Sequence, residues 1–256
     1  MRIVILGAGN LATNIAKALK RAGHDIVQVY SRTMASAEVL AGDVGCGAVD
    51  DLSLVDRDAE VCIIAVKDTA IKEVAQALDL QRPVVLHTAG SIPMSVFEGC
   101  ARRYGVLYPM QTFTKSREPD FAEIPCFVEG NDEQTLQTIT LLARSISNDV
   151  RPLSSERRRY LHLAAVYACN FVNHCYRLSS EVLRRCGIPF DVMLPLIDET
   201  ARKVHDIPPA EAQTGPAVRC DRNVMDAHLD LLADDALMKD IYRLMSRSIH
   251  KKSKHD

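Results

Sequence analysis

The first half of the chain alternates short runs of β-branched residues with longer segments whose apolar residues recur every three or four positions. The runs predict strands and the longer segments predict helices. This alternation is typical of a mostly parallel sheet wrapped by helices, because each helix carries the chain back to begin the next parallel strand. We predict strands at 2–6, 25–30, 60–66, 83–87, 106–108 and 126–128, and helices at 11–21, 34–40, 69–78, 94–103 and 133–144.

After about residue 150 the alternation stops and no further strand is expected. Ser154 and Ser155 can cap a long helix from about 157 to 186, which Gly187 would end. Further helices are expected at 190–204, 224–233 and 236–249, with a proline-rich connection at 207–221. The predicted fold class is therefore α/β, with a Rossmann-type sheet domain at 1–152 and an all-helical domain at 153–256.

The composition excludes several classes of protein. A net charge of -2 and 47% hydrophobic residues argue against a disordered chain and against a nucleic-acid-binding one. No apolar stretch approaches the roughly 20 residues of a membrane span. The eight cysteines are scattered without metal-ligand spacing, which favours reduced thiols, a cytoplasmic location and no metal site.

A glycine-rich turn directly follows the first predicted strand and opens the first predicted helix. It reads Gly7-Ala8-Gly9-Asn10-Leu11-Ala12, the G-x-G-x-x-A pattern of dinucleotide-binding proteins. The first glycine permits the tight turn, the second lets backbone amides approach a pyrophosphate, and the helix N-terminus favours its charge. The alternative is a tight βα connection without a ligand.

The segment after the second predicted strand reads Tyr30-Ser31-Arg32-Thr33. Proteins that prefer NAD place an acidic residue here to bind the ribose 2′-hydroxyl, and this chain has none. An arginine between two hydroxyl side chains suits a 2′-phosphate, so Ser31, Arg32 and Thr33 predict NADP(H) as the cofactor. The alternative is that a hydroxyl caps the next helix and Arg32 is only solvated.

Two more strand ends point to the same edge of the sheet. Ligands of such sheets bind beyond the carboxyl ends of the strands, so these turns are expected to contact the cofactor. Alternatively, Asp68 or Thr69 caps a helix and Gly90 only forms a turn. The cofactor-binding residues predicted at these two ends are Ala65, Val66, Lys67, His87, Thr88, Ala89 and Gly90.

Together with HTAGS, Tyr108-Pro109-Met110-Gln111-Thr112, LHLAAVYACNFVNH and QTGPAVRCD, these motifs resemble a known bacterial family over nearly the whole chain. Its members join a Rossmann-like NADP-binding domain to a C-terminal domain of unknown function. The family is similar in layout to pyrroline-5-carboxylate reductase, the β-hydroxyacid dehydrogenases and the deazaflavin-dependent NADP reductases.

The resemblance implies a helical domain like that of 6-phosphogluconate dehydrogenase, a homodimer, and an active site between the domains. β-Hydroxyacid dehydrogenases carry a lysine four positions before an asparagine on the first long helix. If Asn170 matches that asparagine, Val166 takes the place of the lysine, so their proton donor is absent.

The long helix offers other groups for proton transfer. At 100° per residue, His162, Cys169 and Asn173 share one face, with Asn170 about 80° from His162. The predicted catalytic residues are His162, as a proton donor near neutral pH, and Asn170 and Asn173, which could hold a carbonyl or imine. The alternative is a polar helix interface that is satisfied structurally.

Substrate contacts are expected from two further segments. Gln111 and Thr112 follow the fifth predicted strand of the sheet, and Thr214 and Arg219 lie in the proline-rich connection. A glycine-led turn carrying a hydroxyl and a cation could close over an anionic substrate. Alternatively, Asp221 caps the next helix and Arg219 pairs with it on the surface.

The function predicted from these features is an NADP(H)-dependent oxidoreductase acting on a small carbonyl, imine or hydroxyacid in an interdomain cleft. A flavin or deazaflavin stays open as the hydride partner. The alternative function is a non-catalytic NADP-binding regulator or scaffold, which would not need the polar helix face. Neither nucleic acid nor membrane is expected as a partner.

Overall fold

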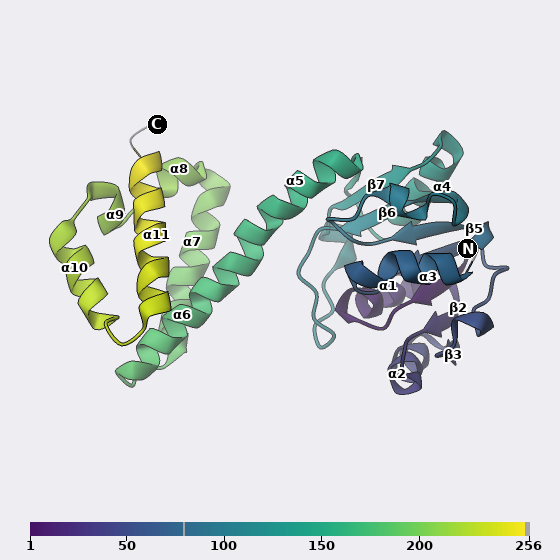
Figure 1. Cartoon of the computed structure of the whole chain (residues 1–256), viewed down its shortest axis with the longest axis horizontal. Coiled ribbons are helices and arrows are strands. Elements are labelled where there is room, and N and C mark those ends of the chain that lie inside the picture. Colours follow the sequence, from purple (N-terminus) through teal and green to yellow (C-terminus); the bar gives the residue numbers. More distant parts are fainter. Residues whose placement is uncertain (79, 254–256) are drawn as a thin grey trace. The chain divides into compact units, whose positions relative to one another are not determined.

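The computed structural model describes residues 1–78 and 80–253, which form two compact units, Met1–Asn170 and Phe171–Asp256. In Figure 1 the first unit, coloured purple to teal, contains the sheet, and the second, coloured green to yellow, contains helices only. The predicted domain boundary at 152 coincides with the end of the last strand, whereas the compact units divide later, within a helical segment.

The sheet of the first unit has the strand order β3-β2-β1-β4-β5-β6-β7-β8. Neighbouring strands are parallel except β6 and β7, which are antiparallel. The Rossmann-type, mostly parallel sheet that the sequence predicts is confirmed. The strands are β1 (Arg2–Leu6), β2 (Asp25–Tyr30), β3 (Gly47–Val49), β4 (Val61–Ile64), β5 (Leu80–His87), β6 (Ala101–Pro109), β7 (Cys126–Gly130) and β8 (Val150–Pro152).

Helices cover both faces of the sheet. Ile3 and Ile5 of β1 pack in one buried cluster with residues of α1 (Asn10–Arg21), α2 (Met34–Val44) and α4 (Glu133–Arg144). Val4 and Leu6 point to the other face and pack with residues of α3 (Ile71–Leu78). Because successive strand residues alternate between faces, a strand apolar at every position must be buried on both sides, as β1 is.

The helix predicted at 94–103 is wrong. Only a single 3-10 turn forms, η3 (Met94–Phe97), and β6 already begins at Ala101. Gly99, with a φ of 78°, turns the chain between the two elements. The apolar spacing suggested a helix, but backbone pairing of β6 with β5, from Leu80–Ala101 to His87–Val106, outweighs that local preference.

The strands β3 and β8 lie at the two edges of the sheet and were not expected. Each has only three residues, so neither gives a recognisable alternation in the sequence. β8 also corrects the expectation that no strand forms after about residue 150. The remaining 3-10 turns of the first unit are η1 (Leu52–Leu54), η2 (Asp68–Ala70) and η4 (Phe121–Glu123).

The long helix predicted from 157 to 186 is present, but a wider turn interrupts it. It comprises α5 (Ser155–Ala165), a π-helical segment (Val166–Phe171) and α6 (Val172–Arg185). Ser154 caps α5 by accepting a hydrogen bond from the Arg157 amide. The division between the two units falls at the end of the π-helical segment.

Among its described residues the second unit contains helices and connecting loops but no strand, as predicted. The proline-rich connection contains two short helices, each with a proline in its first turn. No helix within residues 1–78 and 80–253 has both the length and the apolar character to span a membrane. After α6 come η6 (Phe190–Met193), α7 (Leu194–Asp206), α8 (Pro209–Ala212), α9 (Pro216–Arg219), α10 (Arg222–Leu231) and α11 (Ala236–Lys252).

Candidate functional site

The glycine-rich turn connects β1 to α1 with the geometry of a phosphate-binding loop. Gly7 has a φ of 123°, and a Cβ there would lie 2.7 Å from the carbonyl carbon of Ala65, so only glycine fits. Gly9 precedes α1 without a side-chain cap, and a Cβ on Gly9 would meet no atom within 4 Å. The first turn of α1 contains no acidic residue, so its amides and partial positive charge are available to an anion.

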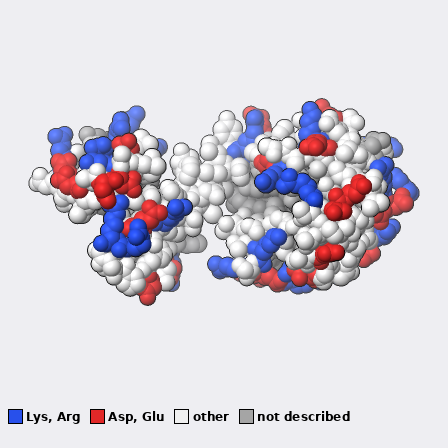
Figure 2. Space-filling model, turned by 60° about the horizontal axis from the view of Figure 1, so that its bottom comes forward, with Lys and Arg blue, Asp and Glu red and all other residues white. Residues whose placement is uncertain are grey.

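A cavity of about 650 Å³ opens beside this turn, at the carboxyl ends of β1, β2, β4 and β5. Figure 2 shows a hollowed face on the larger unit, with Lys and Arg side chains beside the hollow. The predicted cofactor-binding residues that line the cavity are Gly7, Ala8, Gly9, Asn10, Leu11, Ser31, Arg32, Ala65, Val66, Lys67, Thr88 and Ala89. The predicted residues Thr33, His87 and Gly90 do not line it.

The end of the cavity next to β2 is suited to a phosphate. Arg32 is exposed there and makes no hydrogen bond or ion pair with any described residue, so its guanidinium can bind a ligand. Ser36 also lines the cavity and accepts a hydrogen bond from the Thr33 hydroxyl at 2.9 Å, which leaves its own proton free to donate. Sequence reasoning missed Ser36, although it lies one helical turn after the predicted Thr33.

The rest of the cavity wall was not predicted as cofactor-binding. Its polar members include Asp68, which accepts a hydrogen bond from the Ser91 hydroxyl at 2.6 Å. This bond joins the turn after β4 to the turn after β5. The further lining residues are Tyr30, Leu52, Thr69, Ala70, Glu73, Val74 and Ala77.

His87, the last residue of β5, stabilises the turn that follows this strand. Its side chain is fully buried, and its Nδ1 accepts a hydrogen bond from the Ala89 amide at 3.2 Å. Burial, reinforced by the nearby Arg158 guanidinium, lowers the pKa of His87 to about 3. The imidazole is therefore neutral at physiological pH and supports the Thr88–Gly90 turn rather than facing the cavity.

His162 of α5 packs directly on that turn. A Cβ at Gly90 would lie 2.6 Å from the His162 Cγ, so the absence of a side chain at Gly90 makes room for the ring. Gly90 does not have a positive φ, and close packing is thus the reason for glycine at this position. His162 is consequently held against Gly90, the residue that follows Ala89 of the cavity wall.

Tyr108, near the end of β6, holds the other side of the same imidazole. Its hydroxyl lies 3.0 Å from the His162 Nδ1, and the two rings meet edge to face. Tyr108 is 8% exposed, and burial raises the pKa of its phenol, which therefore stays neutral. A bond at Nδ1 leaves the His162 Nε2 as the atom able to exchange a proton with a ligand. Tyr108 begins the segment Tyr108–Thr112, one of the motifs on which the family resemblance rests, but its contact with His162 was not predicted.

The π-helical segment changes the predicted arrangement on the long helix. The angles assumed uninterrupted α-helix, whereas the wider turn rotates less per residue, so that side-chain directions lag by up to about 100° at its end. His162 and Asn173 therefore do not share one face in the predicted way, and Asn170 comes closer to the direction of His162. Both asparagines are exposed, and their roles stay predictions.

The predicted substrate-binding residues do not line the cofactor cavity. Gln111 and Thr112 lie in the exposed loop after β6, where the Gln111 Oε1 accepts a hydrogen bond from the Thr112 amide. Thr214 and Arg219 belong to the second unit. Asp221 caps α10 through the Val224 amide, as the alternative interpretation predicts, but it forms no ion pair with Arg219.

Two known families match successive parts of the chain. Residues 2–90 match the family described as NADP oxidoreductase, coenzyme F420-dependent. Residues 124–249 match the family described as a domain of unknown function (DUF2520). No curated protein matches the chain.

Solved structures resemble the chain over nearly its full length. The "putative NADP oxidoreductase" of Bacteroides fragilis is 52% identical, with a TM-score of 0.95 and 98% of each chain covered. A Thermotoga maritima protein is 25% identical, with a TM-score of 0.78 and 97% of this chain and 99% of that chain covered. The 1-pyrroline-5-carboxylate reductase of Streptococcus pyogenes is 14% identical, with a TM-score of 0.66 and 98% of each chain covered, and shares the fold.

Proposed function

This chain belongs to a family of NADP oxidoreductases whose N-terminal domain is of the coenzyme F420-dependent type and whose C-terminal domain is the one of unknown function, and we propose that it reduces a small carbonyl or imine or oxidises a small hydroxyacid. One observation carries this proposal: His162 lies against Gly90, the residue that follows the cavity-lining Ala89, and its Nδ1 is hydrogen-bonded to Tyr108. A nucleotide-binding scaffold would need no such proton-transferring group there.

The residues of the cavity fit NADP(H). We propose that the amides of Gly9, Asn10 and Leu11 bind the pyrophosphate, because the start of α1 is uncapped and free of acidic side chains. Arg32, with the hydroxyls of Ser31 and Ser36, would bind the 2′-phosphate. NADPH supplies a hydride when it is bound.

The chain itself must then supply a proton to the reduced oxygen or nitrogen. We propose that the His162 Nε2 delivers this proton and that Tyr108 keeps the ring oriented through Nδ1. Asn170 and Asn173 remain proposals as amides that hold the carbonyl or imine. Gln111, Thr112, Thr214 and Arg219 remain proposals as substrate contacts.

The test is a screen for substrate-dependent NADPH oxidation with small ketones, aldehydes and cyclic imines, and for NADP⁺ reduction with small hydroxyacids. The wild-type protein is compared with His162→Ala and with His205→Ala. His205 is an exposed histidine of α7 whose side chain forms no hydrogen bond, ion pair or ring contact with the described residues. We expect turnover that His162→Ala lowers by about 10²- to 10⁴-fold and His205→Ala leaves unchanged. Unchanged turnover in His162→Ala would remove His162 from the mechanism.

A deazaflavin is a second candidate for the hydride partner. The description of the family matched by residues 2–90 names coenzyme F420, which favours this alternative over a flavin. The same assay with oxidised coenzyme F420 in place of a carbonyl tests it. If no compound of either class is reduced although NADPH binds, a regulator or scaffold function replaces the enzymatic one.

We further propose a cytoplasmic homodimer. Large apolar side chains are exposed in the second unit, including Leu231 at 75%, Leu237 at 72% and Leu244 at 62%. A surface of this kind favours a protein partner, and a second copy of the chain is the simplest one. All eight cysteines are free thiols, which suits a reducing compartment. Sedimentation equilibrium gives the mass that decides between monomer and dimer.

A further inference from the structure

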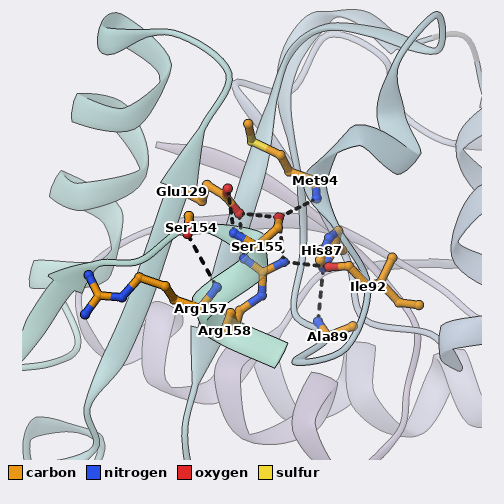
Figure 3. Close-up of polar contacts among 9 residues, drawn as sticks. All are labelled: His87, Ala89, Ile92, Met94, Glu129, Ser154, Ser155, Arg157 and Arg158. Atoms are coloured by element: carbon orange, nitrogen blue, oxygen red, sulfur yellow. Dashed lines mark hydrogen bonds and ion pairs between the residues drawn. The ribbon is translucent and has the colours of Figure 1, made fainter. Parts of the chain in front are cut away.

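A buried ion pair lies beneath the start of α5. Arg158 is 1% exposed, and its Nη1 donates to the Glu129 Oε2 of β7 at 2.6 Å. Its Nη2 donates to the Ile92 carbonyl at 2.5 Å and to the Ser155 hydroxyl at 3.1 Å. Figure 3 shows the Arg158 side chain turned into this cluster, while the neighbouring Arg157 extends away from it.

Ser155 completes the network. Its amide and hydroxyl donate to the two Glu129 carboxylate oxygens at 2.7 and 2.6 Å, and its hydroxyl accepts from the Met94 amide at 3.0 Å. Glu129 is thus held by three donors. The network ties together three segments that are distant in the sequence, namely β7, the loop after β5 and the first turn of α5 (Figure 3).

Two of these segments carry the parts of the proposed proton-transfer site. The loop after β5 contains both Ile92, which Arg158 binds, and Gly90, which supports the His162 ring. On α5, His162 follows Arg158 by four residues and therefore lies on the same side of the helix, one turn further along. A shift of the loop against the helix would change both contacts together.

The need for charge at this buried position is not explained by stability alone. A buried ion pair contributes little to stability compared with apolar side chains of similar volume, because both charges lose their hydration. Its geometry, by contrast, is directional, since a planar guanidinium fixes two partners at once. Here the two partners are the Glu129 carboxylate and the Ile92 carbonyl.

We propose that Arg158 and Glu129 are positioning residues that keep His162 seated between Gly90 and Tyr108. This inference rests on the proposed role of His162 as the proton donor. Neither residue of the ion pair lines the cofactor cavity. The ion pair fixes α5 relative to the loop after β5, so that the His162 Nδ1 stays within hydrogen-bonding distance of the Tyr108 hydroxyl.

The first variant is Arg158→Lys, which keeps the charge but cannot bind Glu129, Ile92 and Ser155 in the same plane. Its matched control is Arg157→Lys, the adjacent exposed arginine of the same helix. The second variant, Arg158→Met combined with Glu129→Gln, removes both charges and so avoids leaving one of them buried alone. Thermal unfolding and calorimetric titration with NADPH establish that each variant is folded and binds the cofactor.

Two readouts test positioning. Turnover with the substrate found for the wild-type protein is expected to fall at least about tenfold in kcat in both Arg158 variants, with the KM for NADPH unchanged. The ¹⁵N NMR signals of the His162 ring, assigned through their loss in His162→Ala, are expected to move towards those of a solvent-exposed imidazole. Arg157→Lys should show neither change.

The ¹⁵N signals of the His162 ring test the positioning role even if no turnover can be measured. Folded Arg158 variants whose His162 signals match those of the wild-type protein would overturn it, and the ion pair would then be structural only. If the wild-type protein reduces no substrate, the proposed function fails, whereas displaced His162 signals in the Arg158 variants would still support the positioning role.

Discussion

At the scale of single residues, Gly7 and Gly90 owe their importance to different causes. Gly7 combines a positive φ with close contact to the Ala65 backbone, which the G-x-G-x-x-A pattern already predicts. Gly90 has an ordinary φ, and the His162 ring, 72 residues later in the sequence, is what leaves no room for a Cβ. Local sequence patterns carry no information about such a distant contact, so this role of Gly90 could not be predicted.

Gly90→Ala should therefore impair catalysis without impairing cofactor binding. The added methyl group would push the His162 ring off the turn, and a misplaced catalytic group can lower kcat by about 10²-fold. NADPH affinity should change little, because Gly90 does not line the cavity. Steady-state kinetics and calorimetric titration measure the two effects. Gly42→Ala in α2, where a Cβ meets no atom within 4 Å, is the matched control.

His87 makes the stability of the protein depend on pH. Below a pH of about 6.5 the imidazole of the unfolded chain is protonated, whereas the buried imidazole stays neutral until its folded pKa of about 3. The unfolded state thus binds the extra proton between these values, and stability falls as the pH falls through this window.

We expect this group to lower the free energy of unfolding by about 2 kcal/mol between pH 7 and pH 5. His87→Asn keeps an acceptor for the Ala89 amide but does not titrate. Urea unfolding at both pH values should show a smaller loss in His87→Asn than in the wild-type protein. An equal loss in the two proteins would mean that His87 is not the cause.

At the scale of secondary-structure elements, the local sequence pattern predicted the bounds of several helices and strands correctly. The helix at Glu133–Arg144 and the strands at Arg2–Leu6 and Asp25–Tyr30 have the predicted bounds. β6 was only partly predicted, because its first residues follow a helical spacing and become a strand through pairing with β5. The π-helical segment leaves no mark in the apolar pattern, so the angles on the long helix were wrong.

The middle of β6 depends on a glycine that allows α4 and β7 to approach. A Cβ at Gly105 would lie 2.5 Å from the Ile139 Cδ1 and 3.0 Å from the Glu129 carbonyl carbon. Overpacking of this kind costs about 1–3 kcal/mol, so Gly105→Ala should lower the free energy of unfolding by that amount. Chemical denaturation measures it, and an unchanged unfolding midpoint would show that α4 can move away without cost.

At the scale of the whole molecule, the sheet topology explains why most of the cofactor residues could be predicted. The carboxyl ends of β1, β2, β4 and β5 meet at one edge, so turns that follow these strands share a cavity whatever their separation in sequence. No comparable rule brings Tyr108, Gly90 and His162 together. Their meeting depends on how α5 docks on the sheet, which the Arg158–Glu129 ion pair helps to define.

The cavity at the carboxyl ends of the strands is expected to bind NADP(H) through Arg32, in support of hydride transfer. Calorimetric titration of the purified protein with NADPH and NADH, repeated with Arg32→Ala, tests it most directly. We predict tighter binding of NADPH, an affinity for NADPH that Arg32→Ala weakens roughly 10- to 100-fold, and an affinity for NADH that it leaves unchanged. Equal affinity for both nucleotides in the wild-type protein would show that Arg32 does not select the 2′-phosphate, and binding of neither would show that the cavity is not a dinucleotide site.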